Sequence, residues 1–177
     1  MIVITGCSTV GKTSLAKLLL AKYPKLYLVP SITTREERDD DLNYIYLTNE
    51  EFERCIEDNK LVDYNQVFNG CWYGTAYNTL IKIHESGRVP LVVTDNHGAK
   101  NFMEKLAPCI INLVPRDRAN IEWRIRNFRT DHIEERIASL DVEIQDDGYF
   151  EHTFKLQELD ECIEQIYDLV ERSLGIK

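Results

Sequence analysis

Positively charged side chains are in short supply in this 177-residue sequence. It carries 21 lysines and arginines against 30 aspartates and glutamates, a formal net charge of -9 at pH 7. A surface of this sign repels phosphate backbones. We therefore expect no nucleic-acid partner, and any anionic substrate has to be held by a local cluster of basic groups and backbone amides.

Long apolar runs and paired cysteines are also missing. No run approaches the roughly 20 apolar residues that cross a bilayer. Met1 leads directly into strand-like residues 2–5, so we expect no signal peptide. The five cysteines are an odd number, and no two stand at metal-ligand or redox spacing. These absences predict a cytoplasmic protein with reduced thiols and no membrane contact.

Strand-like and helix-like patterns alternate along the chain, which is typical of an α/β fold around a parallel sheet. Its length suits one domain, residues 1–177. Short apolar runs close to turn residues predict buried parallel strands at residues 2–5, 26–29, 90–94 and 110–114. Apolar spacing and a capping box predict helices at residues 14–22, 49–59, 118–128, 131–145 and near the C-terminus.

One segment differs from the rest in composition. Residues 33–87 are rich in charged and aromatic side chains, and they lie between the second and third predicted strands. This contrast predicts an insertion on the sheet, with the core formed by residues 1–32 and 88–177. We see no internal repeat, low-complexity tract or long linker.

A phosphate-binding pattern lies between the first strand and the first helix. It consists of Gly6, Cys7, Ser8, Thr9, Val10, Gly11, Lys12 and Thr13. The glycines let the backbone curl so that amide N–H groups point at phosphate oxygens, and the helix start adds partial positive charge. Lys12 can neutralise the β and γ phosphates, and the Thr13 hydroxyl can complete a magnesium site. The loop implies a purine nucleoside triphosphate, such as ATP, with Mg²⁺, but it does not choose between hydrolysis, switching and transfer.

The segment after the second strand favours transfer over hydrolysis and switching. Residues 31–38 read SITTREER, and here the chain resembles the guanylate kinases, whose second strand runs into a serine, two threonines and two arginines three apart. Two guanidinium groups at the mouth of a loop can grip one phosphate bidentately. Arg35 and Arg38 are therefore assigned to the acceptor phosphate.

The resemblance continues through the insertion. Three stretches are similar to the family's tyrosine strand, its base-reading carboxylate and its Tyr-Gly-Ser/Thr segment: residues 43–46, 61–63 and 73–75. By analogy, Tyr44 and Tyr73 donate hydroxyls to the acceptor phosphate. Asp63 accepts from guanine N1–H and its amino group, while Ser31 and Thr75 contact the base.

Two more stretches resemble catalytic parts of the family. Asp95 stands at the carboxyl end of the third strand, where open α/β sheets bind ligands, and it is assigned to magnesium-bound water or to an arginine. Residues 118–136 resemble the family's arginine-bearing lid and the start of the helix that follows it. The arginines that carry this resemblance are Arg124, Arg126, Arg129 and Arg136. Arginine over a transferring phosphoryl group can contribute on the order of 10³-fold or more.

The chain also departs from the family pattern. Asp39 to Asp41 replace a glycine-containing stretch, Asp63 is one methylene shorter than the family's glutamate, and Val93 stands where an aspartate is common. The lid arginines are out of their usual register, and residues 151–154 lack the expected asparagine. These departures bear on the choice of base more than on phosphoryl transfer.

The resemblance implies ATP-dependent phosphorylation of GMP or dGMP by direct in-line transfer, in a monomer or homodimer. The implied fold is a phosphate-loop parallel sheet flanked by helices, with a small inserted nucleoside-monophosphate-binding subdomain and an arginine-rich lid. Three alternatives stay open: a relative that phosphorylates another small phosphate ester or a modified nucleotide, a non-catalytic binding module, and a nucleotide switch. The intact phosphate loop disfavours the binding module, and residues 31–38 with Asp63 disfavour a sugar acceptor.

Overall fold

The computed structural model describes residues 1–37, 43–67, 70–129, 132–145, 148–156 and 158–176. Its centre is a parallel sheet with the strand order β2-β7-β1-β8-β9. In chain order these strands are β1 Ile2–Gly6, β2 Leu26–Leu28, β7 Val89–Val93, β8 Cys109–Pro115 and β9 Thr153–Leu156. The predicted α/β class is confirmed, and the four predicted strands are present.

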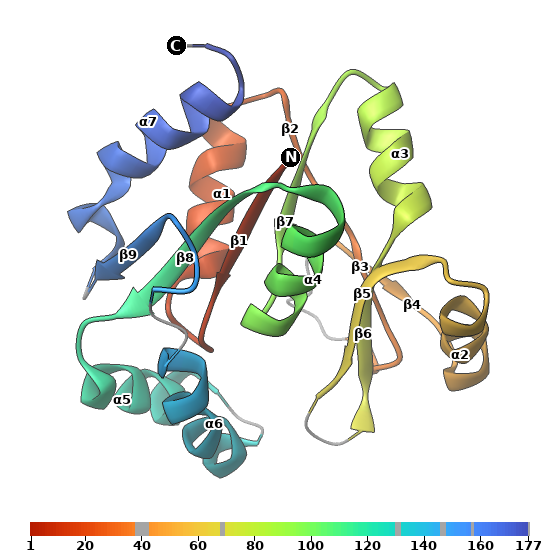
Figure 1. Ribbon diagram of the computed structural model, residues 1–177. Helices are drawn as coiled ribbons and strands as arrows, with labels where there is room; N and C mark the ends of the chain where they lie inside the picture. Colours follow the sequence, from red (N-terminus) through yellow and green to blue (C-terminus); the bar gives the residue numbers. More distant parts are fainter. Residues whose placement is uncertain (38–42, 68–69, 130–131, 146–147, 157, 177) are drawn as a thin grey trace.

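Helices cover both faces of this sheet (Figure 1). One face carries α1 Lys12–Lys22 and α7 Ile163–Ser173, and the other carries α3 Tyr77–Glu85 and α4 Asn96–Leu106. Helices α5 Arg118–Phe128 and α6 Ile133–Gln145 lie at the end of the sheet, beyond β8 (Figure 1), and a 3-10 turn η2 at Leu159–Glu161 precedes α7. Side chains of β1 alternate between the two layers. Ile2 and Ile4 pack in a cluster with α1 and α7, whereas Val3 packs in a cluster with α3 and α4. Burial on both faces explains the continuous apolar run of this strand.

A second, smaller sheet lies beside the first and has the strand order β4-β3-β6-β5 (Figure 1). Its elements are β3 Ser31–Thr33, β4 Tyr44–Tyr46, helix α2 Asn49–Glu57, β5 Leu61–Gln66 and β6 Trp72–Ala76. Strand β3 is parallel to β4 and antiparallel to β6. This sheet falls largely within the segment assigned to the insertion, whose bounds at residues 33 and 87 stay a prediction.

Helix α2 begins at the predicted capping box. The Thr48 hydroxyl accepts from the Glu51 amide at 3.2 Å, and the Glu51 carboxylate accepts from the Thr48 amide at 2.8 Å. The helix buries Phe52 against Ile32 and Leu61 in a hydrophobic cluster of its own, separate from the two clusters of the large sheet. The small sheet is therefore stabilised by its own apolar contacts.

The sequence does not predict α3, α4 and β9 around the large sheet, strands β3, β5 and β6 of the small sheet, or the turn η2. Helix α3 buries two apolar side chains, Leu80 and Ile83, and α4 buries Phe102 and the much smaller Ala99, so their helical periodicity is weak. Strand β9 has four residues and forms the edge of the sheet beside β8. Within the described ranges, no helix has both the length and the apolar character that a membrane span requires.

Candidate active site

The phosphate loop runs from the end of β1 to the start of α1, as its sequence pattern requires. Gly6 has φ 136°, and a Cβ on it would lie 2.1 Å from the carbonyl oxygen of Leu113 in the neighbouring strand. Gly11 has φ 114° at the first turn of α1. Only glycine adopts these conformations readily. The two glycines thus let the loop turn back over the carboxyl end of β1.

Lys12 is held against the carbonyl groups of this loop. Its Nζ donates to the carbonyl oxygens of Gly6 at 2.7 Å and Cys7 at 2.8 Å. Burial lowers the pKa of Lys12, while the nearby Cys7, Glu143 and Asp95 raise it. The ammonium group is therefore already positioned by backbone acceptors where phosphate charge would be bound.

Cys7 is an unreactive part of the loop. Its side chain is buried in the large core cluster, and burial raises the pKa of the Cys7 thiol to about 12. At neutral pH the thiol is protonated, and the thiolate is the nucleophilic form. Cys7 therefore contributes packing and its backbone carbonyl rather than chemistry.

An arginine and two tyrosines meet on the small sheet. Arg35 is 8% exposed; its Nε donates to the Tyr73 hydroxyl at 2.9 Å, and its guanidinium lies 5.2 Å from the centre of the Tyr44 ring. Its backbone amide donates to the Thr33 hydroxyl at 3.2 Å. The structure thus brings together three residues assigned to the acceptor phosphate. Arg38, assigned to the same phosphate, lies outside the described residues, as do Asp39 to Asp41.

Asp63 is the buried carboxylate of the small sheet. It is 7% exposed, and its Oδ2 accepts from the Thr94 hydroxyl at 3.3 Å. Burial raises the pKa of Asp63 to about 6, against the lowering effect of the Thr75 and Thr94 hydroxyls. Its Oδ1 is buried and makes no hydrogen bond of normal geometry within the described part of the chain. An unpaired buried carboxylate oxygen is costly, and a bound donor removes that penalty.

The surroundings of Asp63 combine strands of the small sheet with helix α4. Thr75 is 3% exposed and stands opposite Asp63 in the β5–β6 register, while Ser31 pairs with Tyr44 in β3 and β4. A cavity of about 240 Å³ borders the carboxylate, and it is lined by Val62, Asp63, Tyr64, His97, Asn101 and Lys105. Helix α4 therefore forms one wall of the space beside Asp63.

Asp95 begins helix α4 next to this space. Its Oδ1 accepts from the Gly98 amide at 2.8 Å, and its Oδ2 accepts from the Asn65 side-chain amide at 3.3 Å. Asp95 thus caps α4 and reaches β5 of the small sheet. It also lies close enough to Lys12 to raise the pKa of that group, so this carboxylate stands between the two halves of the site.

Two of the four predicted lid arginines lie near the phosphate loop. Arg136 on α6 donates from one guanidinium nitrogen to the Ser8 hydroxyl at 3.4 Å. Arg129, directly after α5, lies close enough to Lys12 to lower the pKa of that group. Arg129 and Arg136 are therefore the two of these four arginines that lie on the phosphate-loop side.

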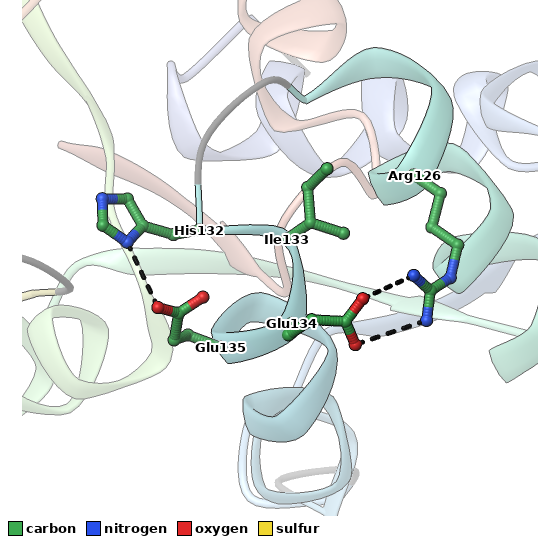
Figure 2. Close-up of a pocket in the computed structure, with 5 residues that line it drawn as sticks. All are labelled: Arg126, His132, Ile133, Glu134 and Glu135. Carbon is green, nitrogen blue, oxygen red and sulfur yellow. Dashed lines mark hydrogen bonds and ion pairs between the residues drawn. The ribbon is translucent and has the colours of Figure 1, made fainter.

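The other two lid arginines are engaged by carboxylates. Arg124 donates to Glu158 at 2.9 Å, and Arg126 donates to Glu134 at 2.6 Å and to Glu122 at 3.2 Å. Arg126 and Glu134 line a surface cavity of about 490 Å³ together with His132, Ile133 and Glu135. Figure 2 shows Arg126 facing Glu134 in this cavity. The catalytic role of these two arginines stays a prediction, since it requires release of these ion pairs.

Several residues of the site were not anticipated from the sequence. Gly98 is one: a Cβ there would lie 2.5 Å from Asp63 Oδ2 and 2.1 Å from the Thr94 hydroxyl oxygen, so only glycine lets α4 approach the carboxylate. The others are polar side chains that brace the site: Thr33, Asn65, Thr94, Asn96 and Glu143. One local signal could have indicated two of them, because Thr94 and Asn96 flank the assigned Asp95.

A phosphate loop on the first strand of a parallel sheet, with an arginine–tyrosine cluster and a buried carboxylate on a small inserted sheet, defines a phosphate-loop kinase of the nucleoside monophosphate class. A family model described as guanylate kinase matches residues 1–173. The chain belongs to the guanylate kinase family, and it is a nucleoside monophosphate kinase.

Individual relatives support this assignment. A guanylate kinase of Prochlorococcus marinus subsp. pastoris is 32% identical over 96% of this chain and 96% of its own length. One from another Prochlorococcus marinus strain is 33% identical over 97% and 96%. The crystal structure of guanylate kinase from Anaplasma phagocytophilum matches with a TM-score of 0.74 at 20% identity, covering 97% of this chain and 84% of that chain. The resemblance noted from the sequence is thereby confirmed.

Proposed function

We propose that this kinase transfers the γ-phosphoryl group of ATP to GMP or dGMP in one in-line step. The observation that carries the choice of base is Asp63, whose buried Oδ1 makes no hydrogen bond with any residue that the structure describes. Guanine presents two adjacent donors, N1–H and the 2-amino group, whereas adenine presents an acceptor at N1. One ionised carboxylate therefore attracts guanine and repels adenine.

The acceptor phosphate is assigned to the cluster of Arg35, Tyr44 and Tyr73. Arg35 is fixed by the Tyr73 hydroxyl, its guanidinium lies beside the Tyr44 ring, and the two tyrosine rings contact each other edge to face. A guanidinium group held in this way binds a phosphate bidentately at a small additional entropic cost. Arg38 is assigned to the same phosphate, and Ser31 and Thr75 to the base.

The donor is assigned to the phosphate loop. In the transfer, an oxygen of the acceptor phosphate forms a bond to the γ-phosphorus while the bond to the ADP oxygen breaks. Lys12, Arg129 and Arg136 are placed to balance the charge on the transferred group. No covalent enzyme intermediate is required.

Mg²⁺ fits the donor side as a partner of Thr13. The Thr13 hydroxyl is exposed in the first turn of α1, and Mg²⁺ prefers oxygen ligands and phosphate oxygens over an all-protein cage. In the described ranges no three His, Cys, Asp or Glu side chains converge on a metal position. Asp95 already accepts two hydrogen bonds, which suits contact through water. When bound, the ion would neutralise phosphate charge.

An ADP-release assay over a panel of acceptors tests this proposal: GMP, dGMP, AMP, CMP, UMP and a sugar phosphate. We expect GMP or dGMP to exceed AMP in kcat/KM by roughly 10⁴-fold, the discrimination that a buried polar group can support. Comparable values for GMP and AMP, or preference for a pyrimidine, would overturn the guanine assignment. Turnover of the sugar phosphate alone would favour the open alternative of another phosphate ester.

A further inference from the structure

The carboxylate of Glu143, near the end of α6, is attached to the phosphate loop. Its Oε2 accepts from the backbone amide of Ser8 at 3.1 Å, and its Oε1 accepts from the Ser139 hydroxyl at 2.7 Å. One oxygen thus binds the loop and the other is held one helical turn earlier on its own helix. The carboxylate is therefore oriented rather than free to rotate.

The backbone of the same residue is tied to the large sheet. The backbone carbonyl of Glu143 accepts from the side-chain Nδ2 of Asn96 at 3.0 Å, and the side-chain Oδ1 of Asn96 accepts from the Thr5 hydroxyl at 2.8 Å. Asn96 is 6% exposed and Thr5 is fully buried. A buried polar network with its partners satisfied is rigid, because each group lost leaves another unpaired. It connects α6 to the start of α4 and to the end of β1.

Arg136 lies on the same helix, seven residues before Glu143. Seven residues make about two helical turns, so the two side chains share one face of α6. Arg136 donates to the Ser8 hydroxyl at 3.4 Å, while Glu143 accepts from the Ser8 amide. Ser8 is consequently held at two points by α6, and any shift of this helix would move Arg136 relative to the loop.

We propose that Glu143 is a positioning residue for phosphoryl transfer, which fixes the phosphate loop and α6 in register so that Arg136 stands over the transferred group. It acts through Ser8 and Arg136 and does not itself contact a phosphate, whose charge it would repel. The inference rests on the proposed role of the phosphate loop in binding the donor. It adds a residue for which the phosphate-loop sequence pattern has no place.

Truncation of the carboxylate tests the proposal. We expect Glu143→Ala to lower kcat by roughly 10- to 100-fold, the size of effect produced by misplacing a catalytic group by about 1 Å. The KM for the acceptor should stay within about twofold, since the acceptor cluster lies on the small sheet. Glu143→Gln keeps an oxygen for the Ser8 amide and a polar partner for Ser139, so it should retain most of the kcat.

Asp141→Asn is the matched control. Asp141 lies on the same helix, is 64% exposed and pairs with Arg118 at the surface, so its kcat should be that of the original protein. Ser139→Ala, which leaves Glu143 but removes its bracing hydroxyl, should lower kcat a few-fold in the same direction. The kcat of Ser139→Ala therefore tests the proposal if Glu143→Ala does not fold. An unchanged kcat in Glu143→Ala would overturn the proposal. If only Ser139→Ala folds, an unchanged kcat in that variant would do the same. Equal losses of kcat in Glu143→Ala and Glu143→Gln would also overturn it.

A spectroscopic measurement separates this inference from the proposed function. The amide resonance of Ser8 in a nitrogen–proton correlation spectrum should shift in Glu143→Ala and stay in place in Asp141→Asn. An inactive wild-type protein would count against the proposed ATP and GMP chemistry but would leave this readout intact. A Ser8 resonance unmoved by Glu143→Ala would show that the attachment does not exist in solution, and the positioning role would fall with it.

Discussion

The phosphate loop and the acceptor cluster are built in two different ways, and the proposed function gives each a different ligand. The loop is eight consecutive residues whose backbone amides are assigned to the donor phosphates, and its lysine is oriented by two carbonyl groups of the same loop. The acceptor pocket collects single side chains from separate strands, such as Arg35 after β3, Asp63 on β5 and Tyr73 on β6. A backbone cradle recognises phosphate charge, whereas separate buried side chains can recognise a particular base. Substitutions on the two sides should therefore have different kinetic signatures.

The largest expected effect is on the loop. Lys12→Ala should lower kcat by roughly 10³-fold, because a cation aimed at the transferring phosphoryl group is lost in a site without another lysine at that position. The fold should persist, so the melting temperature should change by only a few degrees. Lys17→Ala, an exposed lysine of the same helix, is the control. Near-normal turnover of Lys12→Ala would contradict the kinase chemistry proposed for this loop.

The next effect concerns the base. Asp63→Asn should reduce the preference for GMP over AMP by roughly 10²-fold, mainly through a lower kcat/KM for GMP, because the amide retains only one acceptor and introduces a donor. Asp58→Asn, an exposed carboxylate paired with Lys60 on the same subdomain, should leave the preference unchanged. A preference that survives Asp63→Asn would place base recognition on another residue.

Arg35 should affect one substrate only. Arg35→Ala should raise the KM for the monophosphate by about 30-fold, which corresponds to about 2 kcal/mol, while the KM for ATP stays within about twofold. Initial rates with each substrate varied in turn provide the measurement. The exposed Arg54 of α2 is the matched control. Equal weakening of both substrates by Arg35→Ala would remove this arginine from the acceptor side.

The smallest effect is on stability and depends on pH. Burial raises the pKa of Asp63 from 3.8 to about 6. Between these values the native state binds more protons than the unfolded state, so the Asp63 contribution becomes less favourable to folding as pH rises through this window. Asp63→Asn removes that penalty and should stabilise the free protein on the order of 2 kcal/mol more at pH 8 than at pH 4.5. Thermal unfolding at the two pH values provides the check, and an equal effect at both would contradict the raised pKa of this buried carboxylate.

The same contrast explains what could be predicted from the sequence. The loop was predictable because its ligand-binding groups are consecutive, and the core strands were predictable because burial on both faces makes them continuously apolar. The capping box likewise located the start of α2. Each of these signals lies within a few neighbouring residues.

The other parts of the candidate site could not be predicted, because they depend on contacts between residues far apart in the chain. Asn65 meets Asp95 across 30 positions and Glu143 meets Ser8 across 135, and nothing local to either sequence position indicates the partner. Gly98 reads as an ordinary glycine until α4 is seen beside Asp63. The four lid arginines look equivalent in sequence, and only the positions of Glu134 and Glu158 separate those near the loop from those in outer ion pairs.

The separate hydrophobic cluster under α2 bears on how this enzyme can change over evolutionary time. Phe52, Ile32 and Leu61 form a cluster separate from the one that contains Cys7 and Val10 of the phosphate loop. The free-energy effects of substitutions at distant sites without shared partners are close to additive. We therefore expect substitutions inside this cluster to combine additively with substitutions in the phosphate loop, so that a lineage could alter its acceptor through the cluster without destabilising the loop.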